Sequence, residues 1–284
     1  MGKIDRLGWT DGIAFESYGL KIGIRTNDAG ALDRVRACLP PGTRPLAGPY
    51  VDYLMSVRLG GARARPNVRN YHLLYAGLQR QARTLDLDDL FQTLENELAL
   101  FIAEFARKRL FVHAGVVGWQ GRALLLPGRT MAGKSSLVAA LVRAGASYYS
   151  DEFAVLDGHG RVHPYPRLLS LRQPMSDGVR RPAPSARPWR VAASDLGGTT
   201  GTEPLPVGLV AMTRYQPRST WKPRPLSPGA SVLELLNNTI SAQRAPEMAL
   251  AVLHRLAPRA RALKGPRPEA DEIAQALLCE LERS

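Results

Sequence analysis

Residues 128–135 read Gly-Arg-Thr-Met-Ala-Gly-Lys-Ser and match the phosphate-binding pattern G-x-x-x-x-G-K-[ST] at every fixed position. Glycines in such a loop let backbone N–H groups converge on an anion, and the following helix directs the positive end of its dipole at the same place. Lys134 is expected to reach the β- and γ-phosphates, and the Ser135 hydroxyl to ligate Mg²⁺. The stretch therefore predicts a binding site for nucleotide phosphates.

The flanking segments have the order that this pattern requires. Arg122–Pro127 is an apolar run of buried-strand length, and Lys134–Arg143 is rich in Ala and Leu with an apolar helical face. Gly145 then ends the helix. Strand, loop and helix thus follow one another, and the expected nucleotide-binding residues are Gly128, Arg129, Thr130, Met131, Ala132, Gly133, Lys134, Ser135 and Ser136.

Length and composition indicate a globular protein of one large or two ordinary domains, with 284 residues, of which 45% are hydrophobic and 22% charged. No run approaches the roughly 18 apolar residues of a membrane span. The first eight residues lack the apolar core of a secretory signal, and Cys38 and Cys279 are too far apart to suggest a metal site. We therefore expect a cytoplasmic protein.

The net charge of +13 would suit an anionic partner such as nucleic acid. However, 32 of the 38 basic residues are Arg, a bias that a GC-rich genome produces without selection for binding. The arginines are scattered, with modest clusters at 180–190 and 255–267, and no aromatic residues are interleaved with them as in nucleic-acid-binding motifs. The Arg bias and the scatter of the basic residues therefore argue against nucleic-acid binding as the main function, while the positive charge is also compatible with an acidic or phosphorylated substrate.

Apolar periodicity divides the chain near residue 108. Residues 1–108 form an α/β amino-terminal region without recognisable chemistry, with strands expected at 13–25, 51–59 and 71–78 and helices at 32–39 and 86–108. Residues 109–284 contain the phosphate loop, with strands expected at 110–117, 123–126, 147–157 and 207–212 and helices at 134–143, 231–238, 248–256 and 270–281. The Pro- and Gly-rich stretch 173–206 is expected to be a long loop.

Phosphoryl transfer also needs a carboxylate near the phosphate loop. Asp151, one helix after the loop, is the best candidate for a catalytic residue or metal ligand beside Ser135, and Glu152 adjoins it. In a strand these two neighbours would point to opposite faces, so only one would face the nucleotide. His113 lies in an apolar run, where both a core and a catalytic role are open; Arg172 and Arg214 could stabilise phosphate charge.

The ordered segments Val112–Val117 with its histidine, Gly128–Ser135 and Ser150-Asp151-Glu152, followed by Tyr165–Arg172, resemble the catalytic domain of the HPr kinase/phosphorylase family and its HPr-kinase-related members. The resemblance covers residues 111 to about 172 well and 205 to 280 only loosely. It implies a P-loop kinase domain with a mixed sheet related to phosphoenolpyruvate carboxykinase. It also implies that ATP and Mg²⁺ bind at Lys134 and Ser135, and that His113 lies beside the transferred phosphate. Asp151 would be metal ligand or base, and Glu152 its partner acid.

Two departures from the family pattern concern the acceptor. Members that act on HPr show two consecutive aspartates where this chain has Asp151-Glu152, and an Arg-Gly-Leu-Gly-like signature that is missing here. The sequence therefore predicts an ATP-dependent, Mg²⁺-dependent kinase whose hydroxyl acceptor is a peptide or protein serine, or a small molecule, rather than HPr. A non-catalytic nucleotide-binding sensor or scaffold with the same fold is the alternative. The sequence does not decide whether the protein forms a homo-oligomer.

Overall fold

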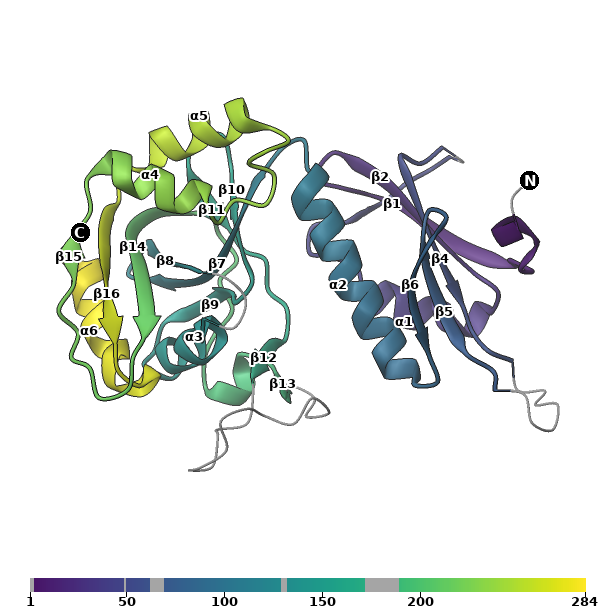
Figure 1. The fold of residues 1–284 in the computed structure, drawn as a ribbon, viewed down its shortest axis with the longest axis horizontal. Coiled ribbons are helices and arrows are strands. Elements are labelled where there is room, and N and C mark those ends of the chain that lie inside the picture. Colours follow the sequence, from purple (N-terminus) through teal and green to yellow (C-terminus); the bar gives the residue numbers. More distant parts are fainter. Residues whose placement is uncertain (1–2, 49, 62–68, 129–131, 172–188) are drawn as a thin grey trace. The chain divides into compact units, whose positions relative to one another are not determined.

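The computed structural model describes residues 3–48, 50–61, 69–128, 132–171 and 189–284. The chain separates into two compact units, Met1–Lys108 and Arg109–Ser284, and each contains helices packed on a β-sheet (Figure 1). The protein is therefore of the mixed α/β class. None of the helices in these described ranges combines the length and the apolar character needed to cross a membrane.

Unit 1 is a six-stranded sheet in the order β3-β1-β2-β4-β5-β6, antiparallel except for the parallel pair β2–β4. Its strands are β1 Asp11–Ser17, β2 Leu20–Thr26, β3 Arg44–Pro45, β4 Tyr53–Arg58, β5 His72–Ala76 and β6 Gln79–Thr84, and its helices are α1 Leu32–Ala37 and α2 Leu87–Phe105. Asp86 is the N-cap of helix α2, and its carboxylate accepts the N–H groups of Asp88 and Asp89. The apolar stripe expected in this helix is buried, including Leu94 and Leu98.

Unit 2 contains an eight-stranded mixed sheet. Its path is β11-β10-β7-β8-β14-β16-β15, with β9 paired to β7 and β11 also paired to β14. Strands β8, β14 and β16 run parallel, while β7 is antiparallel to β8. The strands are β7 Leu110–Trp119, β8 Arg122–Pro127, β9 Ser147–Ser150, β10 Phe153–Leu156, β11 Arg161–His163, β14 Leu205–Tyr215, β15 Arg224–Pro225 and β16 Arg261–Arg267. Strand β12, Leu169–Leu171, forms a separate antiparallel pair with β13, Trp189–Val191.

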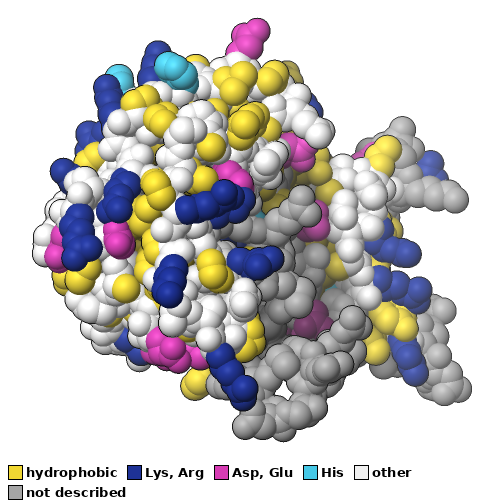
Figure 2. Space-filling view, turned by 60° about the vertical axis from the view of Figure 1, so that its left-hand side comes forward, with side chains coloured by type: hydrophobic (Ala, Val, Ile, Leu, Met, Phe, Trp, Pro, Cys, Tyr) yellow, Lys and Arg dark blue, Asp and Glu magenta, His cyan; other side chains and the backbone are white. Residues whose placement is uncertain are grey.

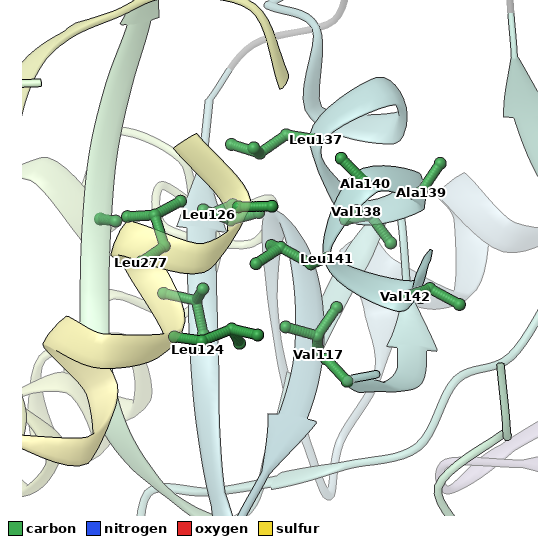
Figure 3. Packing of buried hydrophobic residues seen from close by; sticks show 14 of the residues in the cluster. Val117, Leu124, Leu126, Leu137, Val138, Ala139, Ala140, Leu141, Val142 and Leu277 are labelled. Carbon is green, nitrogen blue, oxygen red and sulfur yellow. The ribbon is translucent and has the colours of Figure 1, made fainter. Parts of the chain in front are cut away.

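Helices cover both faces of this sheet. In Figure 1, α4 (Pro228–Leu236) and α5 (Pro246–Leu256) lie on one side, and α3 (Lys134–Arg143) and α6 (Ala270–Glu282) lie on the other. Leu124 and Leu126 of β8 pack in the cluster with α3 and α6 (Figure 3), whereas Leu125 packs in the cluster with α4 and α5. Burial on both faces explains why β8 reads as a continuous apolar run.

Most expected helices and strands are confirmed, but three expectations change. The strand expected over 147–157 is interrupted, because β9 ends at Ser150 and β10 begins at Phe153. The Ser150 hydroxyl accepts the N–H groups of Glu152 and Phe153 and fixes a bend there. Of the expected 173–206 loop, 173–188 lies outside the described residues, and the remainder contains β13 and a 3₁₀ turn at Ser194–Leu196. Strands β6 and β16 and the short strands β3, β11, β12 and β15 were not expected.

Candidate functional site

The phosphate loop connects the carboxyl end of β8 to the amino end of α3. Its first glycine, Gly128, donates its N–H to the His113 carbonyl (3.2 Å), which ties the loop to β7. Gly133, at the N-cap of α3, has φ 75°, a left-handed conformation that favours glycine. No side chain in the described part of the chain caps this helix, so its first N–H groups stay available to an anion. Arg129, Thr130 and Met131 lie outside the described residues; Ala132 is half-buried and Ser136 exposed.

Lys134 folds back over the loop. Its Nζ donates to the Gly128 carbonyl at 2.7 Å and lies 3.1 Å from His113 Nε2. Burial lowers the pKa of Lys134 to about 8, although Asp151 and Glu152 act in the opposite sense. An added anion would favour the charged form of this amine, so Lys134 is suited to bind a phosphate group.

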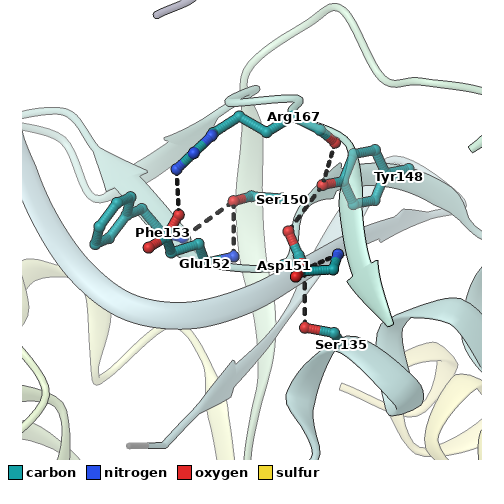
Figure 4. Close-up of polar contacts among 8 residues, drawn as sticks. Ser135, Tyr148, Ser150, Asp151, Glu152, Phe153 and Arg167 are labelled. Carbon is teal, nitrogen blue, oxygen red and sulfur yellow. Dashed lines mark hydrogen bonds and ion pairs between the residues drawn. The ribbon is translucent and has the colours of Figure 1, made fainter. Parts of the chain in front are cut away.

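Asp151 lies over the first turn of α3. Its Oδ2 accepts the Ser135 hydroxyl at 2.8 Å and the Ser170 N–H at 3.3 Å, and its Oδ1 lies 3.1 Å from the Tyr148 hydroxyl (Figure 4). Burial, and then the Asp151 charge, raises the pKa of Tyr148 above its usual range, so the phenol stays a hydrogen-bond donor. Asp151 is only 8% exposed and is held in one orientation by these contacts.

Glu152 turns to a different set of partners. Its carboxylate forms an ion pair with Arg167, whereas Asp151 faces Ser135 (Figure 4). The bend at Ser150, rather than the alternation of a strand, separates the two acids. Asp151 therefore bonds to Ser135 in the first turn of the helix that follows the phosphate loop, whereas Glu152 is paired with Arg167.

His113 is half-buried on β7, with its ring tilted against Phe153 at a centroid distance of 5.9 Å. Burial, and then the charge of Lys134, lowers the pKa of His113 to about 4, against a hydrogen bond with the Glu152 backbone. The imidazole is therefore neutral near pH 7, and its Nε2 can accept the proton of the Lys134 ammonium as a hydrogen bond. His113 thus belongs to the loop environment as well as to the strand.

Ser135 and Asp151 are the oxygen donors that could hold magnesium. Octahedral Mg²⁺–oxygen bonds of about 2.05 Å place neighbouring ligands about 2.9 Å apart, and Ser135 Oγ and Asp151 Oδ2 are 2.8 Å apart. In the described part of the chain, no three His, Cys, Asp or Glu side chains gather into a metal site. A magnesium ion here would complete its shell with phosphate oxygens and water, as this ion usually does.

Three residues of the site were not expected from sequence. Tyr148 and Arg167 position the two acids, and Arg267, at the end of β16, donates from Nη2 to the Gly133 carbonyl at 3.2 Å. The family resemblance over residues 165–172 was the one sequence feature that included Arg167. Nothing in the local sequence distinguished Arg267 from the other arginines, of which the chain has 32 in all. Of the arginines that were considered, Arg214 is exposed at the end of β14 and Arg172 lies outside the described residues.

The positive surface charge is dispersed. On the face drawn in Figure 2, Lys and Arg side chains stand as separate groups among acidic and apolar ones. Several are neutralised by neighbours: Arg143 pairs with Asp271, and Arg261 with Glu280. The surface of this face therefore has no continuous basic stripe of the kind that tracks a nucleic-acid backbone.

Comparison with protein-family models and with curated proteins finds no match for this chain. The function of the site is therefore inferred from the chemistry of its own residues. Those that the structure brings together are a lysine, a hydroxyl, a histidine and two divergent carboxylates around a glycine loop at the start of a helix.

Proposed function

We propose that unit 2 is an ATP- and Mg²⁺-dependent kinase domain of the HPr kinase/phosphoenolpyruvate carboxykinase-like type. It transfers the γ-phosphoryl group to a hydroxyl of a peptide, protein or small molecule that is not HPr. One observation carries the proposal: the Ser135 hydroxyl of the phosphate loop is bonded to the buried Asp151 carboxylate at 2.8 Å. This pairing of a P-loop hydroxyl with an acid from a neighbouring strand end is the magnesium arrangement of P-loop enzymes.

The roles follow from the contacts. Lys134 neutralises phosphate charge, and Ser135 with Asp151 would hold a magnesium ion, which would supply further positive charge to the polyphosphate. Glu152, which does not contact Ser135, accepts the proton of the attacking hydroxyl, and Arg167 orients its carboxylate. Neutral His113 holds the Lys134 ammonium by hydrogen bonding at the loop.

The proposal is tested by incubating the protein with labelled ATP, Mg²⁺ and a panel of serine peptides and small hydroxyl compounds. Lys134→Ala removes a charge-assisted contact to phosphate, so ATP affinity is expected to fall roughly 10–100-fold and transfer to fall with it. Lys222→Ala, which removes an exposed lysine of the same unit, is the matched control. Tight ATP binding without transfer to any acceptor would favour the nucleotide sensor instead, and unchanged binding by Lys134→Ala would refute both.

The pKa of Lys134 predicts a pH dependence of ATP affinity. Phosphate charge raises the pKa of this amine in the complex above its ligand-free value of about 8. The affinity contributed by the ammonium is therefore fully present below pH 8 and is lost as the pH rises above it, by up to about tenfold per pH unit. Calorimetry at pH 8.5 in two buffers of different ionisation enthalpy should report proton uptake on binding, absent in Lys134→Ala. A pH-independent affinity between pH 7 and 10 would contradict this assignment.

A further inference from the structure

Arg267, the last residue of β16, is a buried cation beside the phosphate loop. It is 3% exposed. Its Nη2 donates to the Gly133 carbonyl (3.2 Å) and its Nη1 to the Pro268 carbonyl (3.0 Å). Its Nε is buried and has no hydrogen-bond partner. Across the described ranges, no carboxylate forms an ion pair with this guanidinium.

This environment compensates the charge of Arg267 only in part: the guanidinium lies over the Tyr215 ring, 5.3 Å from its centroid, but it is paired with no carboxylate in the described ranges. A guanidinium cannot be deprotonated at any physiological pH, and the two carbonyls that it contacts are dipoles rather than anions. Burial lowers the pKa of Arg267, and Glu269 and Tyr215 offset the effect only in part. Buried charges in proteins are ordinarily paired, because an unpaired one forfeits its hydration without a counter-ion. The site is therefore short of one negative charge.

The position of Arg267 indicates where that anion would lie. Strands β8, β14 and β16 are parallel, so the phosphate loop, Tyr215 and Arg267 meet at one edge of the sheet, where open α/β sheets bind their ligands. A Cβ on Gly133 would lie only 2.5 Å from Arg267 Nη2, so the guanidinium touches the loop itself. It comes from the β14–β16 side, whereas His113 lies on β7 and Asp151 follows β9, which pairs with β7.

We propose that Arg267 is a second fixed cation of the phosphate site and that the non-transferred phosphates of the bound nucleotide are its missing counter-ion. Its free N–H groups donate to α- and β-phosphate oxygens, while Lys134 and His113 lie on the opposite side of the loop. This inference rests on the proposed nucleotide site, but it concerns the polyphosphate alone. Inorganic tripolyphosphate is therefore a probe that does not depend on recognition of the base or on phosphoryl transfer.

The test measures the affinity of the full chain for ATP and for tripolyphosphate, and the ligand-free melting temperature, in Arg267→Met, Arg267→Lys and the control Arg261→Met, at the opposite end of β16. Arg267→Met is expected to weaken both ligands at least about tenfold, Arg267→Lys less, and the exposed Arg261→Met not at all. Because the lost charge had no counter-ion, the ligand-free melting temperature of Arg267→Met should stay within about 3 °C of wild type. A purely structural role predicts a larger fall in melting temperature with unchanged affinity.

The outcomes separate this inference from the proposed function. Equal affinities of wild type and Arg267→Met for both ligands would overturn the role of Arg267 and leave the kinase proposal standing. Tripolyphosphate binding that depends on Arg267, in a protein that binds no ATP, would support the inference and overturn the kinase. Absence of both binding events from the wild type overturns both. If Arg267→Met does not fold, Arg267→Gln decides: it keeps polar N–H donors but no charge, so wild-type affinity for both ligands in that variant would overturn the role of Arg267 as a cation.

Discussion

Replacing Asp151 by asparagine is expected to slow phosphoryl transfer on the order of 10³-fold. Asparagine keeps the size of the side chain. Its carbonyl oxygen can replace Oδ2 and accept the Ser135 hydroxyl, and its amide group can donate to the Tyr148 hydroxyl, which itself donates to the Arg167 carbonyl, so the bend after β9 should persist. What disappears is the negative charge beside Ser135, and with it most of the attraction for magnesium. Transfer should therefore become dependent on much higher Mg²⁺ concentrations, while the fold of unit 2 is retained.

Initial transfer rates of Asp151→Asn across a magnesium titration, together with its melting temperature, check this prediction. Asp271→Asn is the matched control, because Asp271 is a largely exposed carboxylate of α6 paired with Arg143 at 2.8 Å, and such surface pairs contribute about 1 kcal/mol or less. If Asp151→Asn transfers phosphate at the wild-type rate at the wild-type magnesium optimum, Asp151 and Ser135 do not form the magnesium site. A large fall in melting temperature would instead show that Asp151 mainly stabilises the fold.

The part of the site that sequence predicted is the part encoded by local pattern. The loop at 128–135 depends on glycines, a lysine and a serine at fixed spacing, and Asp151 followed from its position one helix later. The long stripe of α2 and the apolar run of β8 are likewise local, since helix periodicity and burial on both faces are visible in consecutive residues. These elements could therefore be placed without knowledge of the tertiary fold.

What sequence did not reveal depends on pairing between distant segments. Strand β16 contains Gly265 and Pro266, which read as a turn, yet it is held extended by parallel pairing with β14. Arg267 enters the site only because that pairing brings it to the end of β14 and next to Gly133. Arg167 meets Glu152 only after the chain reverses through β11. Neither arginine differs from the other arginines in its local sequence.

The second large effect is expected from Glu152→Gln, which should lower kcat about 10²–10⁴-fold at pH 7. Glutamine keeps the shape of the side chain and a carbonyl oxygen for Arg167, but it cannot accept a proton from the attacking hydroxyl. Affinity for ATP should not fall, because the substitution removes a negative charge near Lys134, on which Glu152 acts electrostatically. The magnesium requirement should also be unchanged, since Ser135 and Asp151 remain bonded to each other.

A lowered kcat with unchanged ATP affinity and magnesium requirement distinguishes the role of Glu152 from that of Asp151, because Asp151→Asn is expected to change the magnesium requirement as well. Glu280→Gln is the matched control: it alters another Glu–Arg pair, to Arg261 at the opposite, amino end of β16. If Glu152→Gln transfers phosphate at the wild-type rate, the proton must go elsewhere. His113 is then the acceptor to test, because its pKa of about 4 keeps its imidazole neutral and its Nε2, now 3.1 Å from Lys134 Nζ, becomes available if that ammonium turns to the phosphates. In that case the rate would fall in His113→Gln, and Glu152 would serve only to position Arg167.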